Sequence, residues 1–381
     1  MRELKGEWRD LFNGFSVALD LKKLLVGFIG LALTFVIGIA GPFFLACLKK
    51  PELWTNFTNG YYDNCHELYH SAWIVILAFP LLWKIVTIAV IYLLLTVVWA
   101  YCGGVITRIA AVNLTKDEGL ELSKALSFAG KKYLAYFSPW VVCILGFFFF
   151  WFWNFLGGLA GRIPYAGELL VAIFLPLAIL SVFIMVFIAI GSIFGSTMFF
   201  PTISVEGSDS FDALSRSFSY LYAKPWHFIW YHLVAAAYGF VTTLFVWWFG
   251  KMMIAFAFCA GIVGMGSKFG DLLNLISLGH GFSCCAMPSS GTGTAIPVTY
   301  SIAAFILAFW LIIVIGFIAA YAVSYCFSAQ TIIYLLLRKK VDEIDVKEIY
   351  EEETEESGIS QPVPPTPPAA EGAKPEEKPQ A

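Results

Sequence analysis

Charged residues are scarce in this chain of 381 residues. Lysine, arginine, aspartate and glutamate together make up 13% of it, about half of the share in a soluble domain. The long apolar runs contain no aspartate or glutamate, and no phosphate-binding loop of the form G-x-x-x-x-G-K-[ST] occurs. These absences exclude an ordinary soluble protein and an ATPase of the P-loop kind. They also count against an ion-coupled transporter, which uses acidic residues inside its spans.

The chain is instead rich in long runs of apolar residues. Hydrophobic residues make up 59% of it, with 36 Phe, 17 Tyr and 13 Trp, and several runs reach the roughly 20 residues that cross a bilayer as a helix. The runs do not alternate in polarity, so helices are expected and a barrel is not. The sequence predicts an all-α, polytopic transmembrane helix bundle with about six spans: Leu24–Cys47, Ile85–Thr107, Leu134–Leu156, Leu169–Met198, Trp226–Phe249 and Tyr300–Leu336. Two shorter apolar pieces, Trp73–Trp83 and Met252–Met265, are interpreted as interfacial segments or as extensions of a neighbouring span.

An amphipathic segment that contains Ala-Leu precedes three of these spans. The copies are Phe15–Ile29, Glu121–Phe137 and Ser210–Phe228, and the second and third match at an offset of 88 residues. A fixed period is evidence of repeated units, so we expect three units, each with an interfacial helix, an outward span, an external loop and an inward span. The predicted divisions are an N-terminal helix 1–23, a membrane domain 24–340 with short helices near 118–132 and 208–224, and external loops 48–72, 157–168 and 266–299.

Lysine and arginine set the expected orientation. With both termini in the cytoplasm, 18 of the 24 basic residues lie on the cytoplasmic side, which predicts a multi-pass protein of the bacterial cytoplasmic (inner) membrane. The lipid bilayer is the expected partner, with a cytosolic or membrane protein partner in addition, and no nucleic acid. The basic residues expected at the membrane surface are Lys22, Lys23, Arg108, Lys131, Lys132, Arg216, Lys224, Arg338, Lys339 and Lys340.

The C-terminal segment 341–381 has a different composition from the rest. It holds many acidic residues and prolines and little apolar mass. Such composition is typical of chain that does not fold by itself. We therefore expect an acidic, proline-rich, disordered cytoplasmic tail.

Three blocks carry a resemblance to a known group of proteins. They are Gly103–Trp140, Pro201–Gly239 and Ser328–Tyr350, which together cover roughly a quarter of the chain. In these blocks and in their order, the chain resembles an uncharacterised family of multi-pass inner-membrane proteins from planctomycete-type bacteria. The resemblance implies a membrane protein, and it supplies no activity and no functional residues.

One short motif points to metal chemistry. Residues His66, Glu67 and His70 form H-E-x-x-H, which on a helix places two histidines on one face for zinc and a glutamate as general base. The segment before it is rich in Asn, Gly and Asp, and no carboxylate lies in a span, so the alternative interpretation is an exposed polar loop. On the same side, Cys65 could form a disulfide with Cys284 or Cys285.

The sequence favours a protein without enzymatic activity and without a cofactor. The preferred hypothesis is a scaffold, assembly or partner-binding subunit that uses its cytoplasmic interfacial helices. The first alternative is a transporter or permease-like subunit that docks a separate motor. The second is a membrane zinc metallohydrolase with its site at His66, Glu67 and His70.

Overall fold

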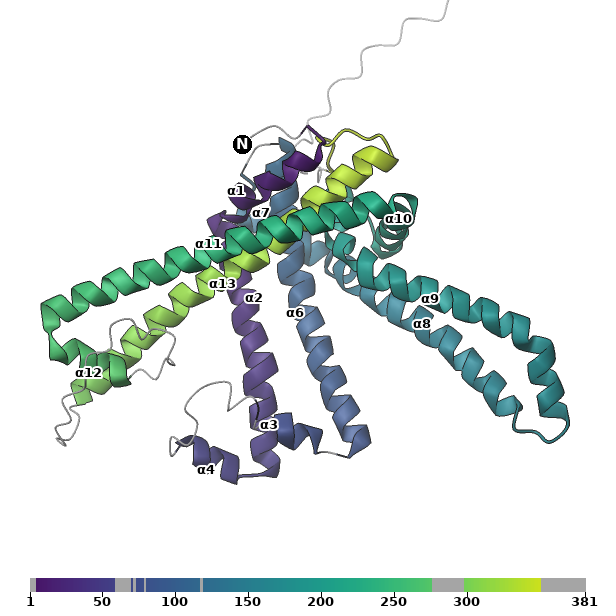
Figure 1. The fold of residues 1–381 in the computed structure, drawn as a ribbon, viewed down its shortest axis with the longest axis horizontal. Coiled ribbons are helices and arrows are strands. Elements are labelled where there is room, and N and C mark those ends of the chain that lie inside the picture. The colour runs from purple at the N-terminus through teal and green to yellow at the C-terminus, as the bar shows by residue number, and fades with distance from the viewer. Residues whose placement is uncertain are drawn as a thin grey trace, which may run out of the picture. The chain divides into compact units, whose positions relative to one another are not determined.

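The computed structural model describes residues 5–58, 70, 73–78, 80–116, 119–275 and 298–350. The chain up to Ile349 is one compact unit, and of the second unit, Tyr350–Ala381, only the first residue is described. Within the described ranges all regular structure is helical, which confirms the all-α prediction (Figure 1).

Six helical stretches in the described part are long and apolar enough to cross a membrane. The chain is therefore an integral, multi-pass membrane protein, as predicted. The first stretch combines α2 (Leu21–Phe35), η2 (Val36–Ala40) and α3 (Gly41–Lys49), and the other five are α6 (Leu81–Lys116), α8 (Tyr133–Ala160), α9 (Ala166–Glu206), α11 (Pro225–Met265) and α13 (Val298–Val341). The segment η2 is a π-helical turn, which is wider than an α-helical turn. It ends two residues before Pro42, whose ring and missing N–H disturb a regular α-helix.

The helices continue past most of the predicted span ends. The piece Met252–Met265 is an extension of α11, and the helix passes through Lys251, whose Nζ lies 4.6 Å from the centre of the Trp247 ring. Residues 73–77 are a separate helical turn before α6. The predicted loop 157–168 shrinks to the five residues between α8 and α9, while α4 (Glu52–Thr58) and α12 (Ser267–Leu275) occupy parts of the other two loops.

Four short helices lie next to the spans: η1 (Trp8–Asn13), α1 (Gly14–Ala18), α7 (Leu122–Lys131) and α10 (Ser210–Ala223). The N-terminal helices stop at Ala18, before the predicted end at residue 23. A new helix begins there because Asp20 caps α2, with its Oδ1 accepting a hydrogen bond from Lys22 N at 3.0 Å. Lys22 and Lys23 therefore lie in the first turn of a span.

The turn between α9 and α10 is encoded by two residues. Gly207 has a φ of 61°, a left-handed conformation that glycine adopts without strain, and it ends α9. Asp209 then caps α10 by accepting a hydrogen bond from Asp212 N at 3.0 Å. Gly207 and Asp209 thus fix where α9 ends and where α10 begins.

The spans associate as three pairs of neighbouring helices. The first span packs on α6, α8 packs on α9, and α11 packs on α13. The second members, α6, α9 and α13, also contact one another. These three inner helices hold the pairs together.

Each short helix packs against the second member of the preceding pair. Helix α7 contacts α6, and α10 contacts α9. Helix α1, at the N-terminus, contacts α13 of the last pair, so the first and last parts of the chain are joined. Residues Val17, Ala125 and Ala213 are each fully buried in these contacts. Protein thus covers part of the apolar face of each short helix, where the sequence predicted lipid headgroups, while Phe211 of α10 remains 68% exposed.

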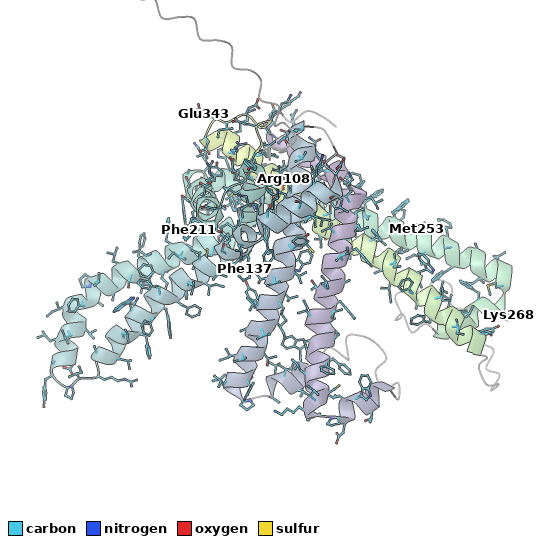
Figure 2. All side chains as sticks on the ribbon, turned by 180° about the vertical axis from the view of Figure 1, so that it is seen from behind. Arg108, Phe137, Phe211, Met253, Lys268 and Glu343 are labelled. Atoms are coloured by element: carbon cyan, nitrogen blue, oxygen red, sulfur yellow. The ribbon has the colours of Figure 1, made fainter. Side chains whose placement is uncertain are left out.

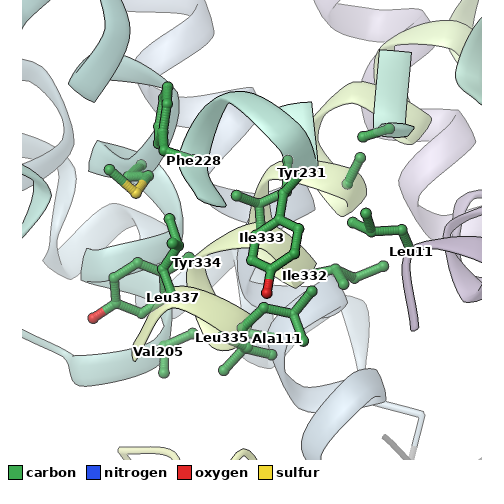
Figure 3. Packing of buried hydrophobic residues seen from close by; sticks show 14 of the residues in the cluster. Leu11, Ala111, Val205, Phe228, Tyr231, Ile332, Ile333, Tyr334, Leu335 and Leu337 are labelled. Carbon is green, nitrogen blue, oxygen red and sulfur yellow. The ribbon is translucent and has the colours of Figure 1, made fainter. Parts of the chain in front are cut away.

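We call the packed ends of the helices the hub. It consists of residues 100–115 of α6, 198–206 of α9 and 320–338 of α13, with η1, α1, α7, α10 and the first turns of α11 around them. Figure 3 shows part of its apolar core, in which Phe228 and Tyr231 of α11 lie against Ile333 and Tyr334 of α13. Gly103 is needed where α6 meets α13, because a Cβ there would lie 2.8 Å from the Phe327 ring.

Outside the hub most side chains of the long helices are exposed or half-buried. Leu145 of α8 is 63% exposed and Phe183 of α9 is 65% exposed. These halves are mainly apolar and suit contact with lipid tails or with other membrane helices. The fold therefore concentrates its internal packing at one end of the helix pairs.

Candidate functional site: a polar network inside the hub

The hub contains buried polar groups at the contacts between its inner helices, and Glu206 is the most connected. Its Oε1 lies 2.7 Å from Arg338 Nε of α13 and accepts a hydrogen bond from Tyr334 Oη at 3.0 Å. The side chain of Arg338 is 4% exposed and that of Glu206 is 14% exposed. A charge buried to this extent is stable only beside an opposite charge. The pair between Glu206 and Arg338 therefore holds the end of α9 against α13.

Arg216 of α10 joins this group from the outside. Its Nε donates to both carboxylate oxygens of Asp212 at 3.0 Å, and its guanidinium lies 3.9 Å from Glu206 and 3.9 Å from Asp342. Asp342 in turn accepts a hydrogen bond from the Tyr220 hydroxyl. Burial, and then this hydrogen bond, raise the pKa of Tyr220 well above its usual range, so the hydroxyl keeps its proton and remains a donor.

The start of the predicted tail belongs to the same network. Arg338 NH1 donates to the carbonyl of Glu348 at 2.6 Å, and Val346 is 2% exposed. Residues 342–349 therefore pack on the hub, which differs from the disorder predicted from residue 341 onward. Of the predicted disordered tail, residues 351–381 lie outside the described residues.

A second polar group joins α6, α8 and α9 around Ser204. Its Oγ lies 2.6 Å from Thr107 Oγ1 and 2.8 Å from the Tyr136 hydroxyl. Arg108 NH1 donates to the Ser204 carbonyl at 2.6 Å, and the Arg108 guanidinium lies 4.1 Å from the centre of the Phe128 ring of α7. All five side chains are buried (Arg108 is labelled in Figure 2).

A third group surrounds the N-terminal end of α2. The side chain of Lys23 is fully buried, and its Nζ donates to Ser328 Oγ of α13 at 3.3 Å. Asp20 lies beside it and accepts hydrogen bonds from Lys22 N and from Asn113 Nδ2, both at 3.0 Å. A buried lysine with a neutral hydroxyl as its hydrogen-bond partner is energetically costly, which makes Lys23 the least expected residue of the hub.

These groups connect helices that are distant in sequence. The charged side chains of Glu206 and Arg338 meet each other, and the hydroxyls of Thr107, Tyr136 and Ser204 contact one another. Hydrogen bonds between helices hold membrane proteins together where the hydrophobic effect does not. The arrangement fits a role in fixing the positions of the helix pairs.

The predicted membrane-surface residues fall into three sets. Lys23, Arg108 and Arg338 are buried in protein, which corrects their predicted contact with lipid. Lys22 and Lys132 donate to the carbonyls of Leu120 and Gly207, at 2.8 and 2.6 Å, and Arg216 forms the ion pairs described above. The exposed or half-exposed remainder is Lys131, Lys224, Lys339 and Lys340.

Most of the predicted external site lies outside the described residues. This holds for His66, Glu67, Cys65, Cys284 and Cys285, while His70 is described and exposed. Among the described residues no group of three His, Cys, Asp or Glu side chains gathers as metal ligands would. The zinc and disulfide hypotheses therefore stay predictions.

The main residues of the hub network were not found from the sequence. Glu206 had one signal, the repeated Glu-Gly that follows an apolar run at residues 118–119 and 206–207. Ser204, Tyr136 and Tyr334 carried none, because hydroxyl side chains are common in membrane helices. Comparisons of the chain with protein families, with curated proteins and with solved structures found no match.

Proposed function

We propose that the protein is a non-enzymatic scaffold of the bacterial cytoplasmic membrane, an assembly or partner-binding subunit that presents three pairs of membrane helices to partner membrane proteins. The observation that carries the proposal is the distribution of packing. Internal contacts concentrate in the hub, whereas the spans beyond it expose most of their side chains. A protein built in this way holds helix pairs in place and leaves their sides available.

The hub supports the first half of this role. Three inner helices meet there, and each contact between them includes a buried polar group or a glycine that allows close approach. Glu206 with Arg338 joins α9 to α13, and Thr107 with Ser204 joins α6 to α9. Such discrete partners favour one arrangement of the pairs over others.

The pair α8 and α9 supports the second half. Between Phe147 and Trp153, α8 carries seven consecutive aromatic residues, and Phe148, Phe149 and Phe152 are more than half exposed. Asn154 Nδ2 donates to Ser181 Oγ at 2.8 Å and closes the contact within the pair. The aromatic side chains that point away from this contact provide large, rigid surfaces for another membrane helix.

The alternatives from the sequence gain no comparable support. His232, the ionisable residue deepest in a predicted span, contacts Thr197 Oγ1 at 3.0 Å and the Phe228 carbonyl at 2.9 Å. These contacts account for it as a link between α11 and α9. The transporter and zinc hydrolase hypotheses stay predictions.

Site-specific photocrosslinking in intact cells tests the scaffold proposal. A photoreactive phenylalanine analogue is placed at Leu145, Phe183 or Phe305, all more than 60% exposed and one in each of α8, α9 and α13. We expect a discrete protein adduct from at least one of these positions. The same analogue at Phe199, which is 1% exposed, is expected to yield no adduct with another protein.

Adducts with lipid alone at all three exposed positions would refute the proposal. An adduct with a second copy of this chain would show that the exposed spans mediate self-association and would overturn the proposal of a different partner protein. To separate the two results, an epitope-tagged and an untagged copy are expressed together and the adduct mass is compared.

A further inference from the structure

Five cations gather where η1, the end of α13 and the start of α11 meet. Lys339 Nζ donates to the carbonyl of Lys5 at 2.7 Å, which joins α13 to the N-terminal segment. Lys340 Nζ lies 5.8 Å from the centre of the Tyr231 ring, and His227 packs edge-on against the same ring at 6.1 Å. We call the group the basic patch, and its members are Lys5, Arg9, Lys224, Lys339 and Lys340.

The basic patch differs from the rest of the hub in its charge balance. Arg216 and Arg338 each have carboxylate partners within 4.0 Å. In the part of the chain that the structure describes, none of the five patch cations forms an ion pair. Of the nearby carboxylates, Asp10 is buried and accepts hydrogen bonds from the backbone N–H groups of Gly6 and Glu7. Asp342 is engaged by Arg216 and Tyr220. Glu7 and Glu343 are the exposed carboxylates nearest to the patch cations in the chain. Five cations therefore stand against two exposed carboxylates, an excess of positive charge.

Exposed aromatic residues border the patch. Trp226 is 80% exposed at the start of α11, and Trp8 and Phe12 of η1 are 41% and 45% exposed. Tryptophan is enriched where a membrane helix leaves the hydrocarbon, because its ring is apolar and its N–H is polar. The combination of tryptophan and lysine at a span end is typical of contact with lipid headgroups.

The backbone at the start of α11 adds partial positive charge to the patch. The first intrahelical hydrogen bond of α11 runs from Phe228 N to the Lys224 carbonyl, 3.0 Å. The N–H groups of Trp226 and His227 precede it, at the positive end of the helix dipole. Lys224 and Lys340 both lie close enough to His227, in this first turn, to act on its charge. These two cations and the start of the helix both favour an anion.

We propose that the basic patch binds the headgroup of an anionic phospholipid. The phosphate lies among Arg9, Lys224 and Lys340, and the acyl chains follow the apolar surface of α11 beyond Trp226. An integral protein with its spans in the bilayer presents this patch continuously to headgroups, which favours lipid over a soluble phosphate compound. The proposal does not rest on the scaffold function.

Native mass spectrometry of the full-length protein in detergent tests this site. Phosphatidylglycerol or phosphatidylcholine is titrated in, and the apparent dissociation constant of the first bound lipid is measured. We expect the unmodified protein to prefer phosphatidylglycerol. In the triple variant Arg9→Gln, Lys224→Gln, Lys340→Gln, we expect binding of phosphatidylglycerol to weaken about 100-fold, since each cation near an anionic surface contributes about a fivefold effect.

A second triple variant controls for net charge. Lys84→Gln, Arg162→Gln and Lys268→Gln remove the same charge at the opposite ends of the spans, where Lys268 is labelled in Figure 2, and should leave the preference unchanged. Equal loss in both variants, or no preference in the unmodified protein, would overturn the proposal. Displacement of the lipid by millimolar inorganic phosphate would also overturn it, by showing a site for soluble phosphate. All six substituted side chains are at least partly exposed, so the variants should fold, and size-exclusion chromatography verifies this.

Discussion

Replacing Glu206 by alanine is expected to destabilise the protein by about 3–5 kcal/mol, the range for a buried ion pair that loses one partner. The loss is large because Arg338 stays behind, 4% exposed, without its carboxylate. Tyr334 also loses the acceptor that lies 3.0 Å from its hydroxyl. Unfolding of the purified protein in detergent, followed by tryptophan fluorescence during heating or titration with SDS, measures the change.

The neighbouring carboxylate Asp212 provides the matched control. It pairs with Arg216 at 3.0 Å, and the side chains of the pair are 41% and 34% exposed. Solvent screening limits a pair of this kind to about 0.2–1 kcal/mol, so Asp212→Ala should be mild. If Asp212→Ala and Glu206→Ala had equal effects, the hub would not depend on the pair between Glu206 and Arg338.

The spans could be predicted from the sequence because they depend on composition alone. Runs of about 20 apolar residues without acidic side chains occur here only as membrane helices. The ends of the spans were predicted less accurately, because α6 and α13 continue beyond the apolar run into the hub. There, residues such as Asn113 and Arg338 become helical and buried through tertiary contacts.

The short helices show a different limit of sequence reasoning. The apolar stripe Leu122, Ala125, Leu126 and Ala129 predicts that one face of α7 is covered. Its two alanines are buried and its two leucines are half-buried. The stripe does not reveal whether lipid or protein covers it. The structure supplies the covering surface, which is α6.

The polar network was beyond prediction because its partners are far apart in the chain. Lys23 meets Ser328 across 305 residues, and Glu206 meets Tyr334 across 128. A lysine at the start of a span is most often at the membrane surface, and this rule gave the wrong position for Lys23. Only the packing of α2 on α13 removes its side chain from solvent.

Replacing Lys23 by methionine is expected to stabilise the protein by a few kcal/mol, roughly the desolvation penalty of one buried ion. Methionine keeps the length of the side chain and is flexible enough to fill the same space. It removes a buried ammonium group whose hydrogen bond is to a neutral hydroxyl, Ser328 Oγ at 3.3 Å. The same unfolding measurement in detergent reads out the gain, with Lys22→Met as the control, because Lys22 donates to the Leu120 carbonyl in a half-buried position.

The direction of the Lys23 result separates two explanations for the charge. A gain in stability would mean that Lys23 lowers the free energy of unfolding, and that its positive charge serves something other than folding. A loss of several kcal/mol would instead show that attraction to Asp20 exceeds the cost of burying both groups. Asp20 already accepts two hydrogen bonds, from Lys22 N and Asn113 Nδ2, so its charge is stabilised without Lys23. For this reason we expect the gain, and we expect the double variant Lys23→Met, Asp20→Asn to lose part of it, because Asp20 also caps α2.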